Sequence, residues 1–133
     1  MKLCLSDFGF FTRNVDDEYA PVEGEAVFDS WPSDEAMLLA FPGRPGKVEQ
    51  MRIDALSVDM RDARDKLMSR VYDAGTQIIR RELETLPIDS AYEAKLIAKR
   101  SELHSYARLL QKVPEQEGFP DIINWPEAPT MEL

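Results

Sequence analysis

The chain has 133 residues, of which 44% are hydrophobic, so it can form one domain with a modest core. Its net charge of −9 disfavours direct binding to nucleic acid, because an acidic surface repels the phosphate backbone. Cys4 is the only cysteine, which excludes an internal disulfide, and no apolar run approaches the roughly 18 residues of a membrane span.

The charge is distributed unevenly along the chain. Residues 1–43 hold two basic and nine acidic residues, residues 44–112 hold fourteen basic and eleven acidic, and residues 113–133 hold five acidic and no basic. The slightly basic middle can therefore attract the acidic ends of its own chain or of a second copy. The N-terminus has neither a continuous apolar core nor a small-residue cleavage site, so we expect no signal peptide and a cytoplasmic protein.

Residues 1–45 are predicted to form a small β-rich region with a short helix. Near the N-terminus the side chains alternate, with Leu3 and Leu5 on one face of a strand and Cys4 on the other. Gly9 interrupts this pattern and indicates a bend. Cys4 is expected to be a small buried residue rather than a nucleophile.

The second half of this region contains the next predicted elements. Residues 16–18 form an acidic loop, and residues 25–31 form a second strand. Ser33 is placed as the N-cap of a short helix over residues 34–41. The Pro-Gly-Arg-Pro-Gly sequence at residues 42–46 then predicts a hinge.

A helical hairpin is predicted over residues 46–113. From about Lys47 to Leu86, apolar residues recur at steps of three and four on one helical face. They are Leu56, Met60, Ala63, Leu67, Val71, Ala74 and Ile78. A domain of this size cannot cover so long a helix, so either Gly75 marks a kink or the helix packs on a second helix and another subunit.

Pro87 ends the first helix, and the second is predicted to start with a capping box over residues 90–93, with Ser90 as N-cap. Its apolar positions keep a seven-residue register, with Lys99 at the one polar position. They are Tyr92, Leu96, Leu103, Tyr106, Leu110 and Val113. This seam predicts an antiparallel hairpin, and it leaves open a homo-oligomer that forms through the helices.

Residues 114–133 are predicted to form an extended, ordered tail that lies in a groove. They contain too many prolines for a helix and too many large apolar side chains for a free linker. An aromatic residue before proline is held extended, so the tail loses little entropy when it docks. The expected anchors are Phe119, Ile122, Ile123 and Trp125. The predicted fold class is α+β, mainly α, with the three segments in one compact unit.

The sequence offers no pattern for catalysis or for metal binding. His104 is the only histidine and is expected to have a surface or packing role on the second helix. One histidine and one cysteine cannot build a structural zinc site, and the acidic loop is expected to be solvated rather than to bind a cation. We therefore expect no enzyme activity, no cofactor and no metal.

The most specific pattern is SELHSYARLLQKVPEQEGFPDIINWPEAP, in which a charged helix is followed by Gly-Phe-Pro and Trp-Pro-x-x-Pro. It resembles the C-terminal signature of bacteriophage tail assembly and tail-fibre assembly chaperones, over roughly residues 100–130. The matching positions are Tyr106, Leu110, Pro114, Gly118, Phe119, Pro120, Ile122, Trp125, Pro126 and Pro129.

The resemblance implies a non-enzymatic phage protein that binds a tail or tail-fibre protein and assists its folding or assembly. Such a chaperone must cover apolar client surface reversibly, which an apolar patch ringed by acidic residues can do. The candidate client contacts are Phe8, Phe10, Phe11, Tyr19, Trp31 and Phe41. The tail aromatics Phe119 and Trp125 form a second candidate patch, and burial in the core is the alternative for each of these residues.

Two other functions remain open at this point. The protein is either a chaperone or a structural adaptor retained in the tail or baseplate, and the net charge also allows an acidic DNA mimic that inhibits a host DNA-binding protein. We expect it in the cytoplasm of the bacterial host, with association with the virion as an open alternative. Its expected partners are a tail or tail-fibre client and further copies of itself, with no nucleic acid and no membrane.

Overall fold

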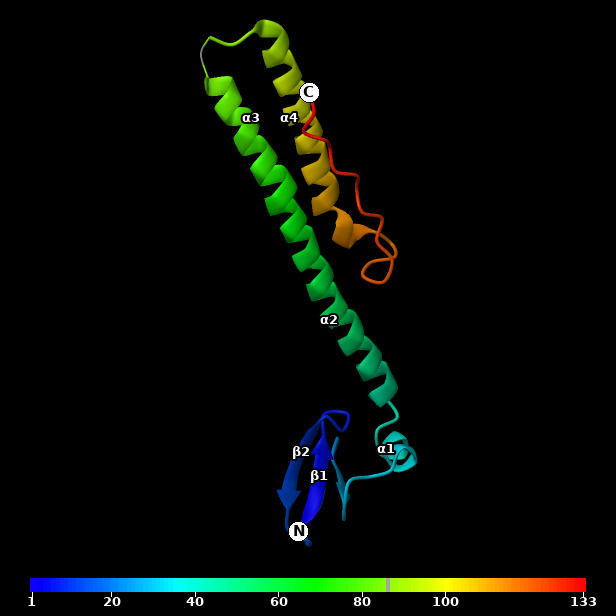
Figure 1. The fold of residues 1–133 in the computed structure, drawn as a ribbon. Coiled ribbons are helices and arrows are strands. Elements are labelled where there is room, and N and C mark those ends of the chain that lie inside the picture. The colour runs from blue at the N-terminus through cyan, green and yellow to red at the C-terminus, as the bar shows by residue number, and fades with distance from the viewer. Residues whose placement is uncertain (86) are drawn as a thin grey trace. The chain divides into compact units, whose positions relative to one another are not determined.

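The computed structural model describes residues 1–85 and 87–133, and it is α+β and mainly α, as predicted (Figure 1). In chain order the elements are β1 (Lys2–Ser6), β2 (Phe11–Val15), β3 (Ala26–Phe28), α1 (Asp34–Ala40), α2 (Arg44–Leu67), η1 (Met68–Asp73), α3 (Ala74–Glu84), α4 (Ser90–Gln111) and η2 (Val113–Glu115). Leu86, where the sequence placed the end of the first long helix, lies outside the described residues.

The chain divides into two compact units, Met1–Arg52 and Ile53–Leu133, rather than the single unit expected. Each unit has its own cluster of buried apolar side chains. Across the residues that the structure describes, no helix combines the length and the apolar character needed to cross a membrane.

The first unit is built on a three-stranded antiparallel sheet with the strand order β2-β1-β3. The central strand β1 pairs Cys4 with Arg13 of β2 and with Val27 of β3. Cys4 is buried, as expected. Because side chains alternate along a strand, Leu5 faces the opposite side of the sheet from Cys4.

Helix α1 completes the core of this unit. Ser33 is its N-cap, as predicted, because the Ser33 hydroxyl accepts a hydrogen bond from the Ala36 amide at 3.2 Å. Met37 is the one buried residue of α1, and it packs with Leu5 and Phe41. Leu3, Ala26 and Phe28 are partly buried against this cluster.

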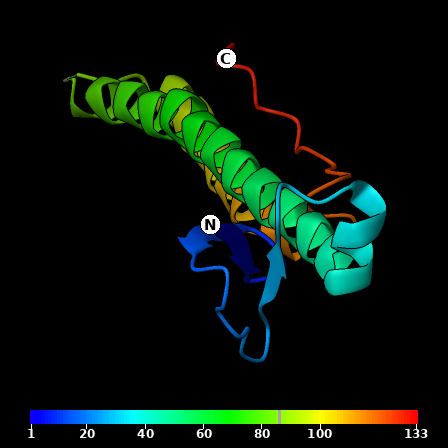
Figure 2. The ribbon, with the colours of Figure 1, turned by 90° about the horizontal axis from the view of Figure 1, so that it is seen from below.

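The elements α2, η1 and α3 follow one another as a single continuous helix (Figures 1 and 2). It begins at Arg44 rather than near Lys47. Pro45 is tolerated in the first turn because an amide there has no acceptor within the helix. The helix does not break at Gly75, and the irregularity is instead the π-helical turn η1 that comes before it.

The π-helical turn shifts the buried face of the helix by one residue. A π turn holds one more residue than an α turn, so the side chains after it are rotated by about 100°. The predicted face is half-buried as far as Val71, but beyond it the prediction is wrong, because Ala74 and Ile78 are exposed. Gly75 and Ile79 are buried in their place.

Helix α4 packs against α3 and η1 to form the predicted hairpin. The seven-residue seam is confirmed, since its buried residues are Leu96, Lys99, Leu103, Tyr106, Leu110 and Val113, with Tyr92 half-buried. Gly75 allows the two helices to approach closely, because a Cβ atom there would lie 2.9 Å from Cδ1 of Leu103. Ile79, Leu96 and Leu103 form the core of the hairpin.

The predicted capping box at the start of α4 is wrong by one residue. The N-cap is Asp89, whose carboxylate accepts a hydrogen bond from the Tyr92 amide at 3.2 Å. Ser90 is instead the first residue of the helix. Aspartate and serine are equally good N-caps, so capping by Asp89 lengthens the helix by one residue without loss of the cap.

Candidate functional site

Large apolar side chains are exposed on the first unit, although a single large apolar patch is uncommon on a monomeric protein. Apart from Met1 at the N-terminus, they are Phe8, Phe10, Phe11, Val22, Trp31, Leu38, Leu39, Val48 and Met51. We call this set the N-terminal apolar residues. Exposed apolar side chains of this kind can serve as a surface for binding another protein, and this is the candidate functional site.

The turn between β1 and β2 presents two of these residues. Asp7, Phe8 and Gly9 all have positive φ angles, of 49°, 57° and 83°, which produces the bend expected at Gly9. A Cβ atom at position 9 would lie 2.8 Å from the sulfur of Met37, so only glycine fits. The turn thus holds Phe8 and Phe10 in fixed positions at the end of the hairpin.

Two cations from the start of α2 hold the rings of this turn. The Arg44 guanidinium lies 4.1 Å from the centroid of the Phe10 ring and donates a hydrogen bond of 2.9 Å to the carbonyl of Phe8. The Lys47 ammonium lies 5.7 Å from the centroid of the Phe8 ring. Such cation–π contacts are worth roughly 0.5–1 kcal/mol each at exposed sites. Both rings therefore have a charged partner and still remain partly exposed.

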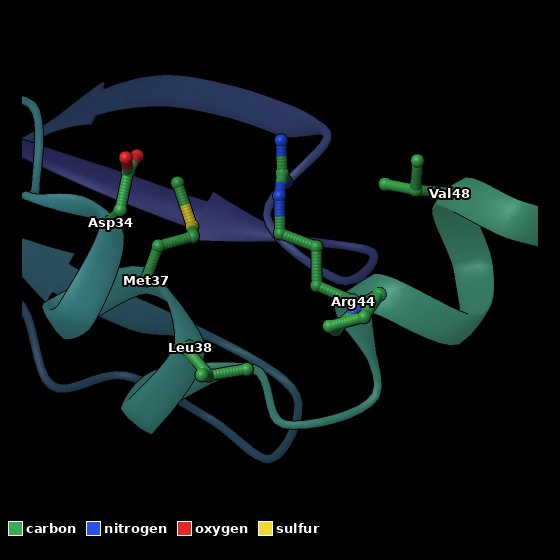
Figure 3. A pocket seen from close by; sticks show the side chains of 6 residues that line it. Asp34, Met37, Leu38, Arg44 and Val48 are labelled. Atoms are coloured by element: carbon green, nitrogen blue, oxygen red, sulfur yellow. The ribbon is translucent and has the colours of Figure 1, made fainter.

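A hollow of about 400 Å³ lies between α1 and the first turns of α2, as Figure 3 shows. Its lining residues are Asp34, Met37, Leu38, Arg44, Pro45 and Val48. Four of the six are apolar, and the volume is within the range of small ligand sites. The hollow can accept apolar side chains from a partner, with one acidic and one basic residue beside them.

Tyr19 is held in a hydrogen-bonded cluster. Its hydroxyl donates to Glu25 at 2.6 Å, and Arg13 donates to both the Tyr19 hydroxyl, at 2.6 Å, and Glu25, at 2.8 Å. The hydrogen bond from Tyr19, followed by that from the Val22 amide, lowers the pKa of Glu25, and the same Tyr19–Glu25 bond raises the pKa of Tyr19. Tyr19 therefore orders the loop between β2 and β3.

The predicted client contacts differ in how exposed they are. Phe41 is only 7% exposed and packs in the core, so it is not available to a partner. Phe11, at 67%, and Trp31 are well exposed. Sequence reasoning missed Leu38 and Leu39. The sequence contained a signal for their exposure. A helix of seven residues buries only one face, so the residues next to the buried Met37 in sequence must point elsewhere.

His104 takes part in the packing of the hairpin. Its Nδ1 lies 3.1 Å from the Tyr72 hydroxyl, and the two rings make an edge contact with their centroids 5.6 Å apart. Among the described residues, no group of three or more His, Cys, Asp and Glu side chains is arranged to hold a metal ion.

The tail belongs to the second unit and lies beside α4 (Figure 1). Gln116 closes its first loop, because its side-chain amide donates to the Asn124 carbonyl at 2.9 Å and accepts from the Asn124 amide at 2.8 Å. The Arg61 guanidinium lies 5.6 Å from the centroid of the Phe119 ring. These contacts indicate an ordered segment.

The predicted anchors of the tail differ in burial. Trp125 is 39% exposed and lines a hollow with Met60, Ala63 and other residues of the long helix. Ile122 is 70% exposed, so its expected role as an anchor is wrong. Of the other motif residues in the tail, Pro120 is buried, and those that are half-buried are Pro114, Gly118, Phe119, Pro126 and Pro129.

Comparison with known proteins identifies the family. A sequence profile described as phage tail assembly chaperone protein matches residues 57–130, which is more than half of the chain. No curated protein and no solved structure matches the chain. The matched residues extend from the middle of α2 to near the end of the tail. The chain therefore belongs to the phage tail assembly chaperone family.

Proposed function

We propose that this chaperone binds a phage tail or tail-fibre protein directly and assists its folding or assembly without catalysis. The observation that carries the proposal is the exposure of the N-terminal apolar residues on a strongly acidic part of the chain. Apolar burial supplies about 25 cal/mol per Å² of surface removed from water. The surrounding negative charge keeps complexes apart, so binding stays reversible and aggregation is disfavoured.

The client surface that we propose is centred on the hollow between α1 and α2. Leu38 and Val48 line it and are exposed, and Phe11 and Trp31 are the most accessible aromatic residues of the same unit. This unit ends at Arg52, before the segment that matches the family begins. We propose that it selects the client, while the matched helices and tail supply the common framework.

A matched pair of double variants tests this assignment. The client is the tail or tail-fibre protein of the same phage, purified and titrated against the chaperone in a calorimeter. Leu38→Ser with Val48→Ser is expected to weaken binding by about tenfold or more, because two apolar contacts are lost. The control is Ile78→Ser with Ile122→Ser, which changes two exposed residues outside the hollow and outside α2. Equal affinities for both double variants would refute the proposed surface.

We also propose that copies of the chain associate through α2. This helix has 24 residues and none of them is buried, although Val48, Met51 and Val58 are apolar and exposed. Amphipathic helices in proteins owe most of their stability to packing of their apolar face. Sedimentation velocity over a wide concentration range checks this, and a monomer at every concentration would reject it.

The proposal needs no cofactor or nucleotide, and it places the chaperone in the cytoplasm of the bacterial host, where tail proteins are made. A chaperone is expected to be absent from purified particles or present in less than fixed ratio. Quantitative mass spectrometry of the virion measures this ratio. A fixed stoichiometry would favour a structural adaptor instead.

A further inference from the structure

Two arginines and a histidine form a row along one exposed side of α4. Arg100, His104 and Arg108 follow one another at four-residue steps, which places them on one side of the helix. Together with Ile97 and Ser101 they line a hollow of about 490 Å³. All five side chains are exposed. We call this set of five residues the basic row.

Among the described residues, neither arginine of the basic row has an acidic partner. In the part of the chain that the structure describes, no carboxylate lies within 4.0 Å of either the Arg100 or the Arg108 guanidinium. By contrast, Arg13 and Lys99 each pair with a glutamate. Arg80 and Arg81 on α3 likewise have no carboxylate partner among the described residues, but Arg100 and Arg108 also line one hollow together with His104. The positive charges of Arg100 and Arg108 are therefore available to an acidic group from another molecule.

The hairpin fixes the central member of the basic row. The π-helical turn η1 brings Tyr72 against α4, where its hydroxyl lies 3.1 Å from Nδ1 of His104. The edge contact of the two rings restricts the imidazole further. With Nδ1 engaged, Nε2 is the nitrogen left to meet a ligand. Single π turns inside helices are frequent at functional sites.

We propose that the basic row binds an acidic segment of the client tail protein. Guanidinium groups bind carboxylates through paired, charge-assisted hydrogen bonds, and the Ser101 hydroxyl can donate a further one. Ile97 offers an apolar contact at the end of the row, which suits an acidic segment that also carries apolar side chains. Because the chain as a whole has a net charge of −9, the basic row would fix where such a segment docks and in which orientation.

This inference rests on the proposed function and adds a second contact to it. The hollow between α1 and α2 would take apolar client surface, and the basic row would take client carboxylates. A nucleic-acid ligand is disfavoured by the net charge of the chain. The two contacts predict different dependences on salt, since screening weakens the ionic contact and leaves the apolar one largely unchanged.

The first test is titration of the client with full-length variants at two salt concentrations. Arg100→Gln with Arg108→Gln is expected to weaken binding about tenfold at low salt, and the loss is expected to shrink as salt is raised. The matched control is Arg80→Gln with Arg81→Gln, which removes the same charge from exposed positions on α3 and is expected to change affinity less than twofold. Circular dichroism confirms that both variants are folded.

The second test uses a probe that does not depend on the client. A peptide of alternating Glu and Leu is titrated into ¹⁵N-labelled chaperone, with a Lys-Leu peptide as control. Amide shifts confined to the basic row, present with the Glu peptide and lost in the arginine double variant, support the inference. Unchanged amides overturn it, and so would a single-stranded oligonucleotide that binds the row more tightly than the peptide.

The outcomes distinguish failure of the basic row from failure of the proposed function. If the wild-type chain binds the client and both arginine variants bind equally well, the basic row is not a docking site, while the proposed function stands. If the wild-type chain does not bind the client at all, the proposed function and the inference both fail.

Discussion

At the scale of single residues, Glu25 links charge to the stability of the first unit. Its carboxylate accepts hydrogen bonds from the Tyr19 hydroxyl and the Val22 amide, and both lower its pKa. A carboxylate whose pKa is lowered on folding stabilises the folded state at pH values above its ordinary pKa, which is about 4.3 for glutamate. This stabilisation is lost as the pH falls through the lowered pKa. We expect Glu25→Gln to be less stable than the wild type at pH 7, with the difference narrowing below about pH 4.

Urea unfolding at pH 7 and at acidic pH measures this difference. Glu23→Gln is the matched control, because Glu23 is exposed in the same loop. The control is expected to unfold like the wild type at both pH values. A difference between wild type and Glu25→Gln that stays constant with pH would show that the hydrogen bonds do not depend on the charge.

Lys99 is a buried cation in the seam of the hairpin. It is 9% exposed and pairs with Glu102 at 3.0 Å, but Glu102 itself remains exposed. Replacing a buried charge by an apolar group of similar length is often neutral or stabilising, and here the carboxylate left behind is solvated. We expect Lys99→Met to leave thermal stability unchanged or to raise it, by about 1 kcal/mol. Lys99→Ala, which also removes the apolar stem, should instead lower it.

At the scale of elements, the shift caused by η1 has a direct test. A valine at position 75 would clash with Leu103, which is fully buried, whereas position 74 is exposed. We expect Gly75→Val to cost about 2–3 kcal/mol of unfolding free energy through overpacking. Ala74→Val, its matched control, should cost only about 0.5 kcal/mol through helix propensity. Chemical denaturation measures both losses. A larger loss for Ala74→Val than for Gly75→Val would mean that position 74, not 75, faces α4, as in a regular α-helix.

The same elements show what the sequence can and cannot predict. The seam of α4 was predictable because its seven-residue period is uninterrupted from Leu96 to Val113. The buried face of the helix after Val71 was not predictable, because a π turn leaves no distinctive residue pattern and depends on packing against α4. Nor could the sequence decide between Asp89 and Ser90 as N-cap, since the two residue types cap equally well.

The candidate site was predictable in its chemistry and less so in its residues. The aromatic content of the first 45 residues indicated an apolar surface, yet residue type alone does not separate Phe41 in the core from Phe11 outside it. That difference depends on which face α1 turns to the sheet. The basic row could be predicted only in part. Its four-residue spacing is visible in the sequence, whereas the lack of acidic partners among the described residues required the structure.

At the scale of the whole molecule, the family-matched segment includes a tail that covers part of the long helix. No residue of α2 is fully buried, and Trp125 lines a hollow together with Met60 and Leu67 of this helix. Deletion of residues 114–133 is therefore expected to lower the melting temperature of the full chain by several degrees, since about 1 kcal/mol corresponds to 2–8 °C in domains of this size range. Calorimetry measures the shift.

Two point variants separate the role of the tail as cover from a general effect of truncation. Trp125→Ala is expected to cost about 1–2 kcal/mol, because a large part of its ring is removed from water. Ile122→Ala should change stability by less than about 0.5 kcal/mol, because Ile122 is exposed and its neighbours lose little by its truncation. Equal effects of the two variants would mean that the tail does not stabilise the helices through Trp125. Packing against the apolar residues of α2 would then have to come from another molecule, which is the role proposed for a second copy.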